Sequence, residues 1–404
     1  MLETTVTLLQ SRPGPPLQLR LARDLTRAIK RGHPWVYTKA LRQLPPAMPG
    51  AQAVLLDNKK GREIGRGFYD PHSPLALRIC ATEPGETLNE HWAQKRLERA
   101  LALRRMLFDG RTTGFRLFNG EGDGLPGLIA DVYGDVAVLQ LDGAGPAGFW
   151  DATGIAGWLA QALALRCVYE RGERGRSEGK SLVGDIPAAP VVFLENGVRF
   201  AVDIVRGQKT GFFLDQRDNR QKIRELAAGR RVLNLFGYTG GFSVYAGLGG
   251  ASQVTTVDIA APALAAAQAN WELNGLPSTG HEIVAADAFE FLAGAAASQR
   301  LWDLVVVDPP SFASSKAAVP KAIAAYQKLI AAAAAVTRPD GLLAAASCSS
   351  HVGLEAFLNA CEEGISLARR RATVLHLGGQ PADHPTPLAL PEFRYLKFVL
   401  MRVE

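Results

Sequence analysis

The strongest constraint on the fold is a regular alternation of short apolar segments with helical segments, which begins after about Asn196. The apolar segments occupy 231–236, 253–258, 281–287, 301–308 and 341–347. Strands that alternate with helices in this way form an open, mostly parallel sheet with helices on both faces. The sequence therefore predicts an α/β domain whose ligands bind at the carboxyl ends of its strands.

The chain before this region divides into two further parts. Its 404 residues are enough for two or three domains. Short alternating segments from 17 to 84 are typical of a small β-rich module, and a helical pattern at 88–108 is followed by strand-like and helical segments. We expect domains at 1–85 (β-rich), 86–195 (mixed α+β) and 196–404 (α/β).

Positive charge is concentrated at the N-terminus. The first 85 residues hold 13 Lys and Arg against 6 Asp and Glu, and the whole chain carries a net charge of +6. Such a surface favours binding of nucleic-acid phosphates, because neutralising them releases counterions. A basic domain that is only well solvated has the same composition, and charge alone does not choose between the two.

The sequence argues against a membrane protein, a disulfide-stabilised protein and a metalloprotein. There is no run of about 18 apolar residues and no basic-then-apolar leader, so we expect a cytoplasmic protein without a membrane partner. The cysteines Cys80, Cys167, Cys348 and Cys361 form no C-x-x-C pair. This spacing argues against a disulfide framework and a structural zinc site, and no metal is expected.

A glycine-rich segment after the first apolar strand predicts a nucleoside cofactor. Gly237, Gly240 and Gly241 stand where the chain must turn sharply and approach a ligand closely. Asp258 ends the next strand, where a carboxylate can accept hydrogen bonds from ribose hydroxyls, and Asp287 ends the third, near an adenine edge. Any one acid can instead cap a helix. Taken together, these strand ends favour S-adenosylmethionine.

A nicotinamide dehydrogenase is the natural rival, since it shares the sheet and the acid after the second strand. It needs the full G-x-G-x-x-G spacing to hold a pyrophosphate, and residues 237–241 do not supply that spacing. The D-P-P sequence at 308–310 also has no role in hydride transfer. The methyl donor is therefore the preferred cofactor.

The fourth and fifth strand ends predict the chemistry. Asp308 and Cys348 lie at the same carboxyl edge, and the polar neighbours of Cys348 distinguish it from an inert buried thiol. C5 of a pyrimidine becomes nucleophilic only after a thiolate adds at C6, and Asp308 can bond the N3/N4 edge of cytosine. The target base must leave its stack. Phe312 is either its stacking face or a core residue.

The segment 202–220 is dense in charged and aromatic residues just before the α/β domain. The residues that look like a lid on the cofactor are Gln208, Lys209, Thr210, Phe213, Asp215 and Gln216. The alternative is a solvated loop that leads into a helix at 217–227. Spacing alone does not decide between them.

These motifs resemble those of the bacterial ribosomal large-subunit (23S) RNA cytosine-5 methyltransferases that carry an N-terminal PUA domain. GHPWVYTKAL (32–41) is similar to the start of the PUA domain, and GQKTGFFLDQRDNR (207–220) to the lid. The methyltransferase motifs are NLFGYTGGFS, VDIA, DPPSFASSK and SCSSH. The resemblance implies PUA, α+β and class I (Rossmann-like) methyltransferase domains, S-adenosyl-L-methionine as cofactor and 23S rRNA as partner.

The resemblance also assigns residues. It implies Cys348 as the catalytic nucleophile and Asp308 as the catalytic base-contacting carboxylate. The expected cofactor-binding residues are Gln216, Asn234, Phe236, Gly237, Tyr238, Thr239, Gly240, Gly241, Asp258, Asp287 and Asp308. The expected substrate-binding residues are Lys209, Phe213, Pro309, Pro310, Phe312 and Lys316. Related enzymes place a second cysteine after the D-P motif, where this chain has Pro310 and Ser311, so a one-cysteine mechanism is implied.

Three alternatives remain open. A sister group that methylates guanine N7 shares the lid and the DPP motif, but guanine N7 is already nucleophilic and needs no thiol. A non-catalytic RNA-binding or assembly factor would keep only a vestigial pocket. An adenine-N6 enzyme would place an aromatic residue directly after the prolines, where this chain has Ser311. The sequence does not identify the target nucleotide. It also does not decide whether the substrate is naked rRNA or an assembled subunit, or whether the protein forms a homodimer.

Overall fold

The computed structural model of the protein describes residues 7–11, 14–83, 85–172, 178–313 and 315–404. Two compact units make up the chain. The first runs to Gly197 and adds Val202–Leu214 and Ala382–Phe393. The second consists of Val198–Ala201, Asp215–Pro381 and Arg394–Glu404. Two β-strands, β11 (Val191–Glu195) and β12 (Val198–Val202), lie where the chain passes from the first unit to the second.

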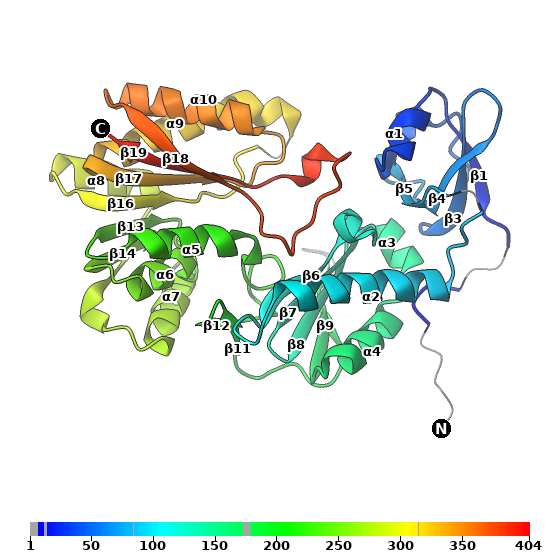
Figure 1. The fold of residues 1–404 in the computed structure, drawn as a ribbon, viewed down its shortest axis with the longest axis horizontal. Helices are drawn as coiled ribbons and strands as arrows, with labels where there is room; N and C mark the ends of the chain where they lie inside the picture. The colour runs from blue at the N-terminus through cyan, green and yellow to red at the C-terminus, as the bar shows by residue number, and fades with distance from the viewer. Residues whose placement is uncertain (1–6, 12–13, 84, 173–177, 314) are drawn as a thin grey trace. The chain divides into compact units, whose positions relative to one another are not determined.

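The first unit begins with a five-stranded sheet in the order β1-β3-β4-β5-β2. Figure 1 labels β1, β3, β4 and β5 of this sheet together with α1. Its strands are β1 (Leu17–Arg20), β2 (Trp35–Tyr37), β3 (Ala51–Leu56), β4 (Glu63–Tyr69) and β5 (Leu75–Ala81). The short helices are α1 (Thr26–Lys30) and η1 (Thr38–Ala40). Leu55, Leu77 and Ile29 are buried between the sheet and α1, so one face of the sheet forms a small core.

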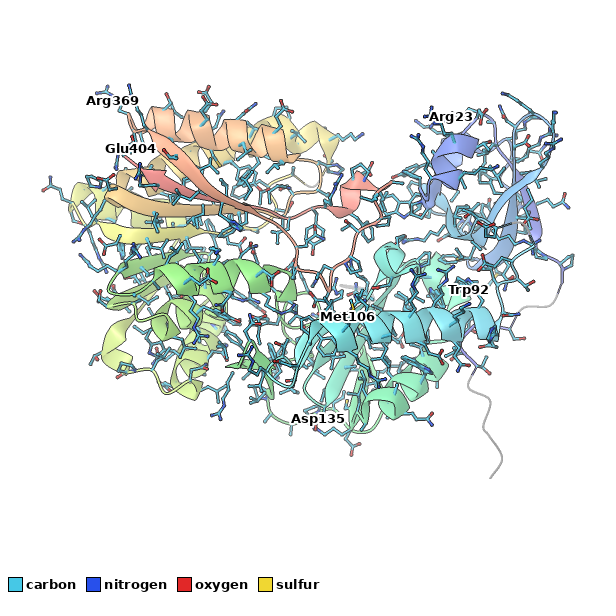
Figure 2. The ribbon with its side chains drawn as sticks, in the orientation of Figure 1. Arg23, Trp92, Met106, Asp135, Arg369 and Glu404 are labelled. Atoms are coloured by element: carbon cyan, nitrogen blue, oxygen red, sulfur yellow. The ribbon has the colours of Figure 1, made fainter. Side chains whose placement is uncertain are left out.

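A second sheet follows in the same unit, in the order β10-β9-β8-β7-β6. Its strands are β6 (Gly114–Asn119), β7 (Leu128–Tyr133), β8 (Val136–Leu141), β9 (Cys167–Glu170) and β10 (Lys180–Val183). The helices are α2 (Glu90–Leu107), η2 (Gly120–Asp123), α3 (Ala144–Phe149) and α4 (Ala152–Leu163). Trp92 on α2, labelled in Figure 2, stacks on Trp150 with ring centroids 5.8 Å apart and anchors this core.

The second unit contains a seven-stranded sheet in the order β15-β14-β13-β16-β17-β19-β18. Its parallel strands are β13 (Arg231–Leu235), β14 (Gln253–Asp258), β15 (His281–Ala285), β16 (Trp302–Val307) and β17 (Thr337–Ser347). The antiparallel strands β18 (Ala372–Gly378) and β19 (Lys397–Val403) complete the sheet. The five predicted strands and their parallel order are confirmed.

Helices cover both faces of this sheet (Figure 1). One face packs against α5 (Arg217–Leu226), α6 (Gly241–Leu248) and α7 (Ala261–Leu273). The other packs against α8 (Ala288–Ala297), α9 (Val319–Ala335) and α10 (Leu354–Leu367). The 3-10 turns η4 (Ser278–Gly280) and η5 (Lys316–Ala318) belong to this unit, η3 (Leu214–Gln216) lies where the chain enters it, and η6 (Pro391–Phe393) belongs to the first unit. The predicted class, a doubly covered α/β sheet preceded by β-rich and α+β parts, is confirmed.

The structure adds elements that the patterns do not predict. β18 lies at the sheet edge, where Val374 and Leu375 are about half exposed, so its residues do not alternate between buried and polar. The middle segment around the glycine-rich turn forms three strands where two are expected: the turn separates β6 from β7, and a second, short turn separates β7 from β8. β2, β10 and β12 are also additional; each has only three to five residues. Such short segments carry too little periodicity to be recognised.

Candidate active site at the carboxyl edge of the sheet

The parallel strands of the second unit bring the predicted site residues to one edge of the sheet. The glycine-rich loop follows β13, and Asp258 is the last residue of β14. Asp287 comes two residues after β15, and Asp308 and Cys348 directly follow β16 and β17. Carboxyl ends of parallel strands are where open sheets of this kind bind ligands.

The loop after β13 has an unusual backbone. Phe236 and Tyr238 have φ angles of 57° and 45°, in the left-handed region that side chains rarely adopt. A Cβ on Gly237 would lie 2.4 Å from Thr256 Cγ2, and Gly240 has a φ of 78°, so glycine is required at both positions. Backbone in these regions costs roughly 1–3 kcal/mol per residue and concentrates at ligand sites.

Buried polar side chains hold this loop from within the unit. Asn234 is 1% exposed, and its amide donates to the Ser243 hydroxyl at 2.8 Å. Ser243 in turn shares a 2.6 Å hydrogen bond with Thr256. The Thr239 carbonyl accepts from the Asn270 amide at 2.9 Å. The Asn234 side chain therefore supports the loop from its interior side.

The two strand-end acids make different contacts. Asp258 accepts the backbone N–H of Tyr238 at 2.8 Å and that of Ala260 at 2.9 Å, one on each carboxylate oxygen. Since each oxygen has a second acceptor position, the carboxylate can still bind hydroxyl groups. Asp287 uses one oxygen to accept the backbone N–H groups of Phe289 and Glu290, which makes it the N-cap of α8.

Two apolar residues beside these acids are missed by the sequence analysis. Ile259 follows Asp258 and is 76% exposed, and Phe289 lies two residues after Asp287 and is 39% exposed. Exposed apolar side chains next to carboxylates that retain acceptor positions suit the flat face of a purine nucleoside. Their position directly after strand-end acids is the signal that could have identified them.

Gln216 connects the segment before the sheet with the reaction edge. Its side chain is 3% exposed; Nε2 donates to Asp308 Oδ2 at 2.9 Å, and Oε1 accepts from Asn219 Nδ2 at 2.6 Å. The neighbouring Asp215 accepts the Tyr395 hydroxyl at 2.7 Å. The predicted cofactor residue Gln216 thus orients the predicted catalytic carboxylate.

The loop after Asp308 places the predicted substrate residues in different settings. Pro309 is buried, whereas Pro310 and Lys316 are exposed. The Phe312 ring lies 4.9 Å from that of Tyr326 and packs against the core on the α9 face. Residue 314 of this motif lies outside the described residues. Phe312 therefore makes the core contact that one interpretation of the sequence expects.

Cys348 differs from the other three cysteines in exposure. It is partly exposed, whereas Cys80, Cys167 and Cys361 are buried. Burial raises the pKa of Cys361 to about 12 and also raises the pKa values of Cys80 and Cys167. A thiol that stays protonated at neutral pH is a poor nucleophile, so these three are unsuited to covalent chemistry.

The lid-like segment is divided between the units. Lys209, Thr210 and Phe213 belong to the first, whereas Gln216 belongs to the second. Lys209 Nζ lies 4.5 Å from the Phe213 ring centroid, a cation–π contact. The Thr210 hydroxyl donates to buried Asp131 and shares a hydrogen bond with Tyr133. The Thr210 side chain therefore anchors the segment to the second sheet of the first unit.

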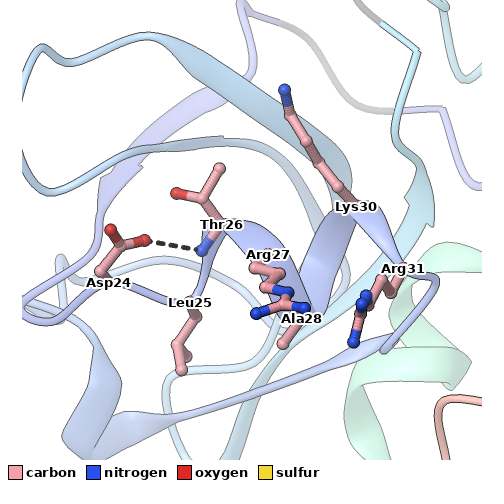
Figure 3. A pocket seen from close by; sticks show the side chains of 7 residues that line it. All are labelled: Asp24, Leu25, Thr26, Arg27, Ala28, Lys30 and Arg31. Carbon is pink, nitrogen blue, oxygen red and sulfur yellow. Dashed lines mark hydrogen bonds between the residues drawn. The ribbon is translucent and has the colours of Figure 1, made fainter.

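The N-terminal sheet presents a basic surface. Its exposed cations are Arg23, Arg27, Lys30, Arg31, Lys39, Arg42, Lys59, Lys60 and Arg62. Three of them surround a hollow at α1, where Asp24 accepts the Thr26 N–H at 3.0 Å (Figure 3). Arg27 and Arg31 point to one side of α1 and Lys30 extends away from them (Figure 3). This arrangement suits a polyanion.

Membrane-spanning helices and metal-ligand clusters are both absent from the part of the chain that the structure describes. None of the helices that the structure describes is long and apolar enough to cross a membrane. Within the same residues, no three His, Cys, Asp or Glu side chains gather as ligands for a metal ion.

Two family models match the chain. Residues 151–385 match the S-adenosylmethionine-dependent methyltransferase family, and residues 19–82 match a PUA-like domain. A "Ribosomal RNA large subunit methyltransferase" of Deinococcus radiodurans is 40% identical, covering 97% of this chain and 98% of the relative. A "Ribosomal RNA large subunit methyltransferase I" of Photobacterium profundum is 38% identical, covering 93% and 97%.

Two solved structures of methyltransferases are similar to this chain in fold and sequence. A protein described as a SAM-dependent methyltransferase from Streptococcus mutans is 25% identical with a TM-score of 0.83. A structure described as a methyltransferase complexed with SAH is also 25% identical, with a TM-score of 0.85. In both cases 96% of this chain and 100% of the solved chain are covered.

Proposed function

Because this chain belongs to the bacterial family of S-adenosylmethionine-dependent ribosomal RNA large subunit methyltransferases, we propose that it methylates C5 of a cytosine in 23S rRNA. Methyl transfer to large-subunit rRNA follows from family membership. The choice of base and the covalent route are our inference from the residues at the sheet edge.

Cys348 is the observation that carries this proposal. It is the partly exposed cysteine at the carboxyl edge, one strand away from Asp308, since β16 and β17 are neighbours. C5 of cytosine requires a nucleophile at C6 before it can accept a methyl group, whereas guanine N7 does not. A thiol at this place therefore favours cytosine C5 over the guanine-N7 alternative.

In the proposed mechanism Cys348 and Asp308 act on the flipped base. The Cys348 thiolate forms a bond to C6, and the π electrons of the C5–C6 bond move to C5. C5 then takes the methyl group, and the donor's sulfur–methyl bond breaks with its electron pair left on sulfur. Asp308 accepts a hydrogen bond from the N4 amino group and, when it carries a proton, donates to N3, where negative charge develops as the thiolate adds. Loss of the C5 proton and expulsion of the thiolate then restore the ring. Gln216 keeps the Asp308 carboxylate in place through its 2.9 Å hydrogen bond.

The residues of the cofactor half fit S-adenosylmethionine. Asp258 retains acceptor capacity for ribose hydroxyls, and Ile259 and Phe289 expose apolar surface for the adenine. The strained backbone at Phe236 and Tyr238 directs the glycine-rich loop towards the same edge. When bound, S-adenosylmethionine supplies an electrophilic methyl group. The proposed cofactor set is that of the sequence analysis, with Asn234 acting through the loop that it supports.

The remaining domains are proposed to hold the RNA. The domain boundaries at 85 and 195 are part of this proposal, with the PUA-like part supplying phosphate contacts through its exposed cations. Lys209, Phe213, Pro310 and Lys316 are proposed to contact substrate. We also propose a cytoplasmic location, because an rRNA substrate is found there. The oligomeric state, monomer or homodimer, is not part of the proposal.

The test is direct identification of the product. The protein is incubated with methyl-labelled S-adenosylmethionine and unmodified 23S rRNA, which is then digested to nucleosides and separated by chromatography with mass detection. We expect label in 5-methylcytidine. Label in 7-methylguanosine would keep the fold and cofactor but remove the thiol mechanism, and an absence of label on both naked RNA and assembled subunits would favour a non-catalytic assembly factor.

A further inference from the structure

Lys397 is a buried cation next to the reaction edge. It is the first residue of β19, and its Cα pairs with Ser347, the last residue of β17 and the neighbour of Cys348. The Lys397 side chain is only 4% exposed. Burial of an ammonium group is costly unless it is paired or hydrogen-bonded, so its presence here requires an explanation.

The partners of the ammonium group are carbonyl oxygens. Nζ donates to the Ser349 carbonyl at 2.6 Å and to the Tyr395 carbonyl at 2.7 Å. In the part of the chain that the structure describes, Lys397 forms no ion pair with an Asp or Glu. Both carbonyls lie at the sheet edge, and Ser349 directly follows Cys348. Lys397 therefore fixes the backbone at Ser349, the residue that follows Cys348. Its positive charge is not paired with a carboxylate.

Cys348 is the group that can match this charge. Burial lowers the pKa of Lys397 to about 8, and a negative charge on Cys348 opposes this by raising it. A lysine with this pKa is mostly protonated at neutral pH. The attraction between two charges is mutual. A thiolate at Cys348 favours the protonated form of Lys397, and protonated Lys397 equally favours the thiolate.

The other titratable groups that the structure describes near this strand end include a phenol and two carboxylates. Tyr326 on α9 bonds the Ser347 and Ser349 hydroxyls at 2.9 and 3.0 Å, and burial raises its pKa, which keeps it neutral. The other titratable groups of the edge are Asp308, exposed His351, and Asp215, which accepts the Tyr395 hydroxyl. The carboxylates among them disfavour a thiolate.

We propose that Lys397 is a positioning residue that stabilises the thiolate form of Cys348 and fixes the backbone that carries it. This inference rests on the proposed function, because it gives the nucleophile of that reaction its reactive state. Lys397 does not act on the RNA base itself, since its side chain is 4% exposed and its ammonium is directed at two backbone carbonyls.

The test measures thiol reactivity without methyl transfer. Wild-type protein and the Lys397→Gln variant are alkylated with iodoacetamide over a range of pH, and modification of the Cys348 peptide is followed by mass spectrometry. Glutamine retains donors for the two carbonyls but lacks the charge. We expect alkylation near neutral pH to be about tenfold slower in Lys397→Gln, with its midpoint shifted to higher pH.

Two further variants make the result specific. Lys397→Arg keeps the charge and should react within about threefold of wild type, and Lys321→Gln, which neutralises an exposed lysine of α9, should leave the profile unchanged. Circular dichroism checks folding, and Lys397→Met replaces Lys397→Gln if the latter does not fold. An unchanged Cys348 profile in a folded neutral variant, or a charged variant as slow as the neutral one, would overturn the proposal.

The same measurement separates this inference from the proposed function. Alkylation of Cys348 does not depend on which base is methylated. A Lys397→Gln shift together with full activity of Cys348→Ala would retain the electrostatic pair and reject the covalent mechanism. An inactive Cys348→Ala with no Lys397→Gln shift would retain the mechanism and reject the role of Lys397.

Discussion

The Gln216 amide donates a 2.9 Å hydrogen bond to Asp308, although 92 positions separate the two residues in the sequence. Gln216 is in turn held by Asn219 on α5, so the segment that enters the sheet domain fixes the carboxylate at the end of β16. A carboxylate held by a buried donor has a defined direction, which is what recognition of a cytosine edge requires.

Replacement of Gln216 by Leu should lower kcat/KM about 10- to 100-fold, because a hydrogen bond to a charged group contributes roughly 1.5–3 kcal/mol. Asp308→Asn should have a larger effect, at least about 100-fold, since an amide cannot transfer a proton to N3 of the reacting base. Steady-state methyl transfer and calorimetric binding of S-adenosylmethionine check both variants. Wild-type kcat/KM in Gln216→Leu would contradict the positioning role.

Asp258 and Asp287 should give distinguishable defects. Asp258→Ala removes the acceptor for the Tyr238 and Ala260 N–H groups, so we expect S-adenosylmethionine binding to weaken at least tenfold, roughly the loss of one or two charged hydrogen bonds. Asp287→Ala removes the N-cap of α8 and should destabilise the protein by about 1 kcal/mol.

Asp287→Ser is the matched control for that pair, because serine caps helices nearly as well as aspartate. Its free energy of unfolding should stay close to that of wild type, so its binding constant reports only the cofactor contact of the carboxylate. Weakened S-adenosylmethionine binding in Asp287→Ser supports this contact, whereas wild-type binding would restrict Asp287 to a capping role.

The cations around α1 should contribute to RNA affinity in a salt-dependent way. In the Arg27→Ala, Lys30→Ala, Arg31→Ala triple variant, the slope of log Kd against log salt concentration should fall by about 2, since each lost phosphate contact contributes about 0.7. Filter binding of 23S rRNA fragments over a salt series measures the slope. S-adenosylmethionine affinity serves as the control and should be unchanged; an unaltered slope would remove α1 from the interface.

His281 should make the second unit sensitive to acid. Its imidazole is hydrogen-bonded to Thr256 and Gln268 and stacks on Trp271 with centroids 4.4 Å apart, and burial lowers its pKa from 6.5 to about 4. The unfolded chain takes up the proton first, so the stability from neutral His281 is complete above pH 6.5 and is lost as the pH falls towards 4.

His281→Gln lacks this titration and provides the comparison. Between about pH 7.5 and about pH 5, wild type should lose about 2 kcal/mol more of its free energy of unfolding than the variant does. Denaturant unfolding at the two pH values measures the difference. Equal losses in the two proteins would show that folding does not lower the pKa of His281, so that the imidazole is protonated in the folded protein at about pH 5.

The sequence patterns predicted the parts of the fold that repeat. The five parallel strands are recognised because each is apolar, bounded and followed by a helix, and polar residues at their ends identify the reaction edge. β18 and β19 are not predicted, because no α-helix lies between them and they do not continue the alternation of strands and helices. In addition, Val374 and Leu375 of β18 are about half exposed, so the strand shows no buried face.

The site contains contacts that no local pattern encodes. Lys397 is a single lysine in an apolar C-terminal strand, and its meaning depends on the pairing of β19 with β17. The Gln216–Asp308 bond likewise depends on tertiary structure. Asp287 shows the opposite case, since its capping bonds follow from local sequence, whereas a cofactor contact cannot be inferred from spacing alone.

The central claim, a covalent adduct between Cys348 and cytosine C6, is tested most directly by trapping. Large-subunit rRNA transcribed with 5-fluorocytidine cannot lose fluorine from C5 as it loses a proton, so elimination is blocked and an adduct persists. With S-adenosylmethionine present, wild type should form an RNA–protein complex that resists denaturant and maps to Cys348, whereas Cys348→Ala should bind the cofactor but form none. Equal complex formation by Cys348→Ala, or 5-methylcytidine production by that variant on ordinary rRNA, would contradict the mechanism.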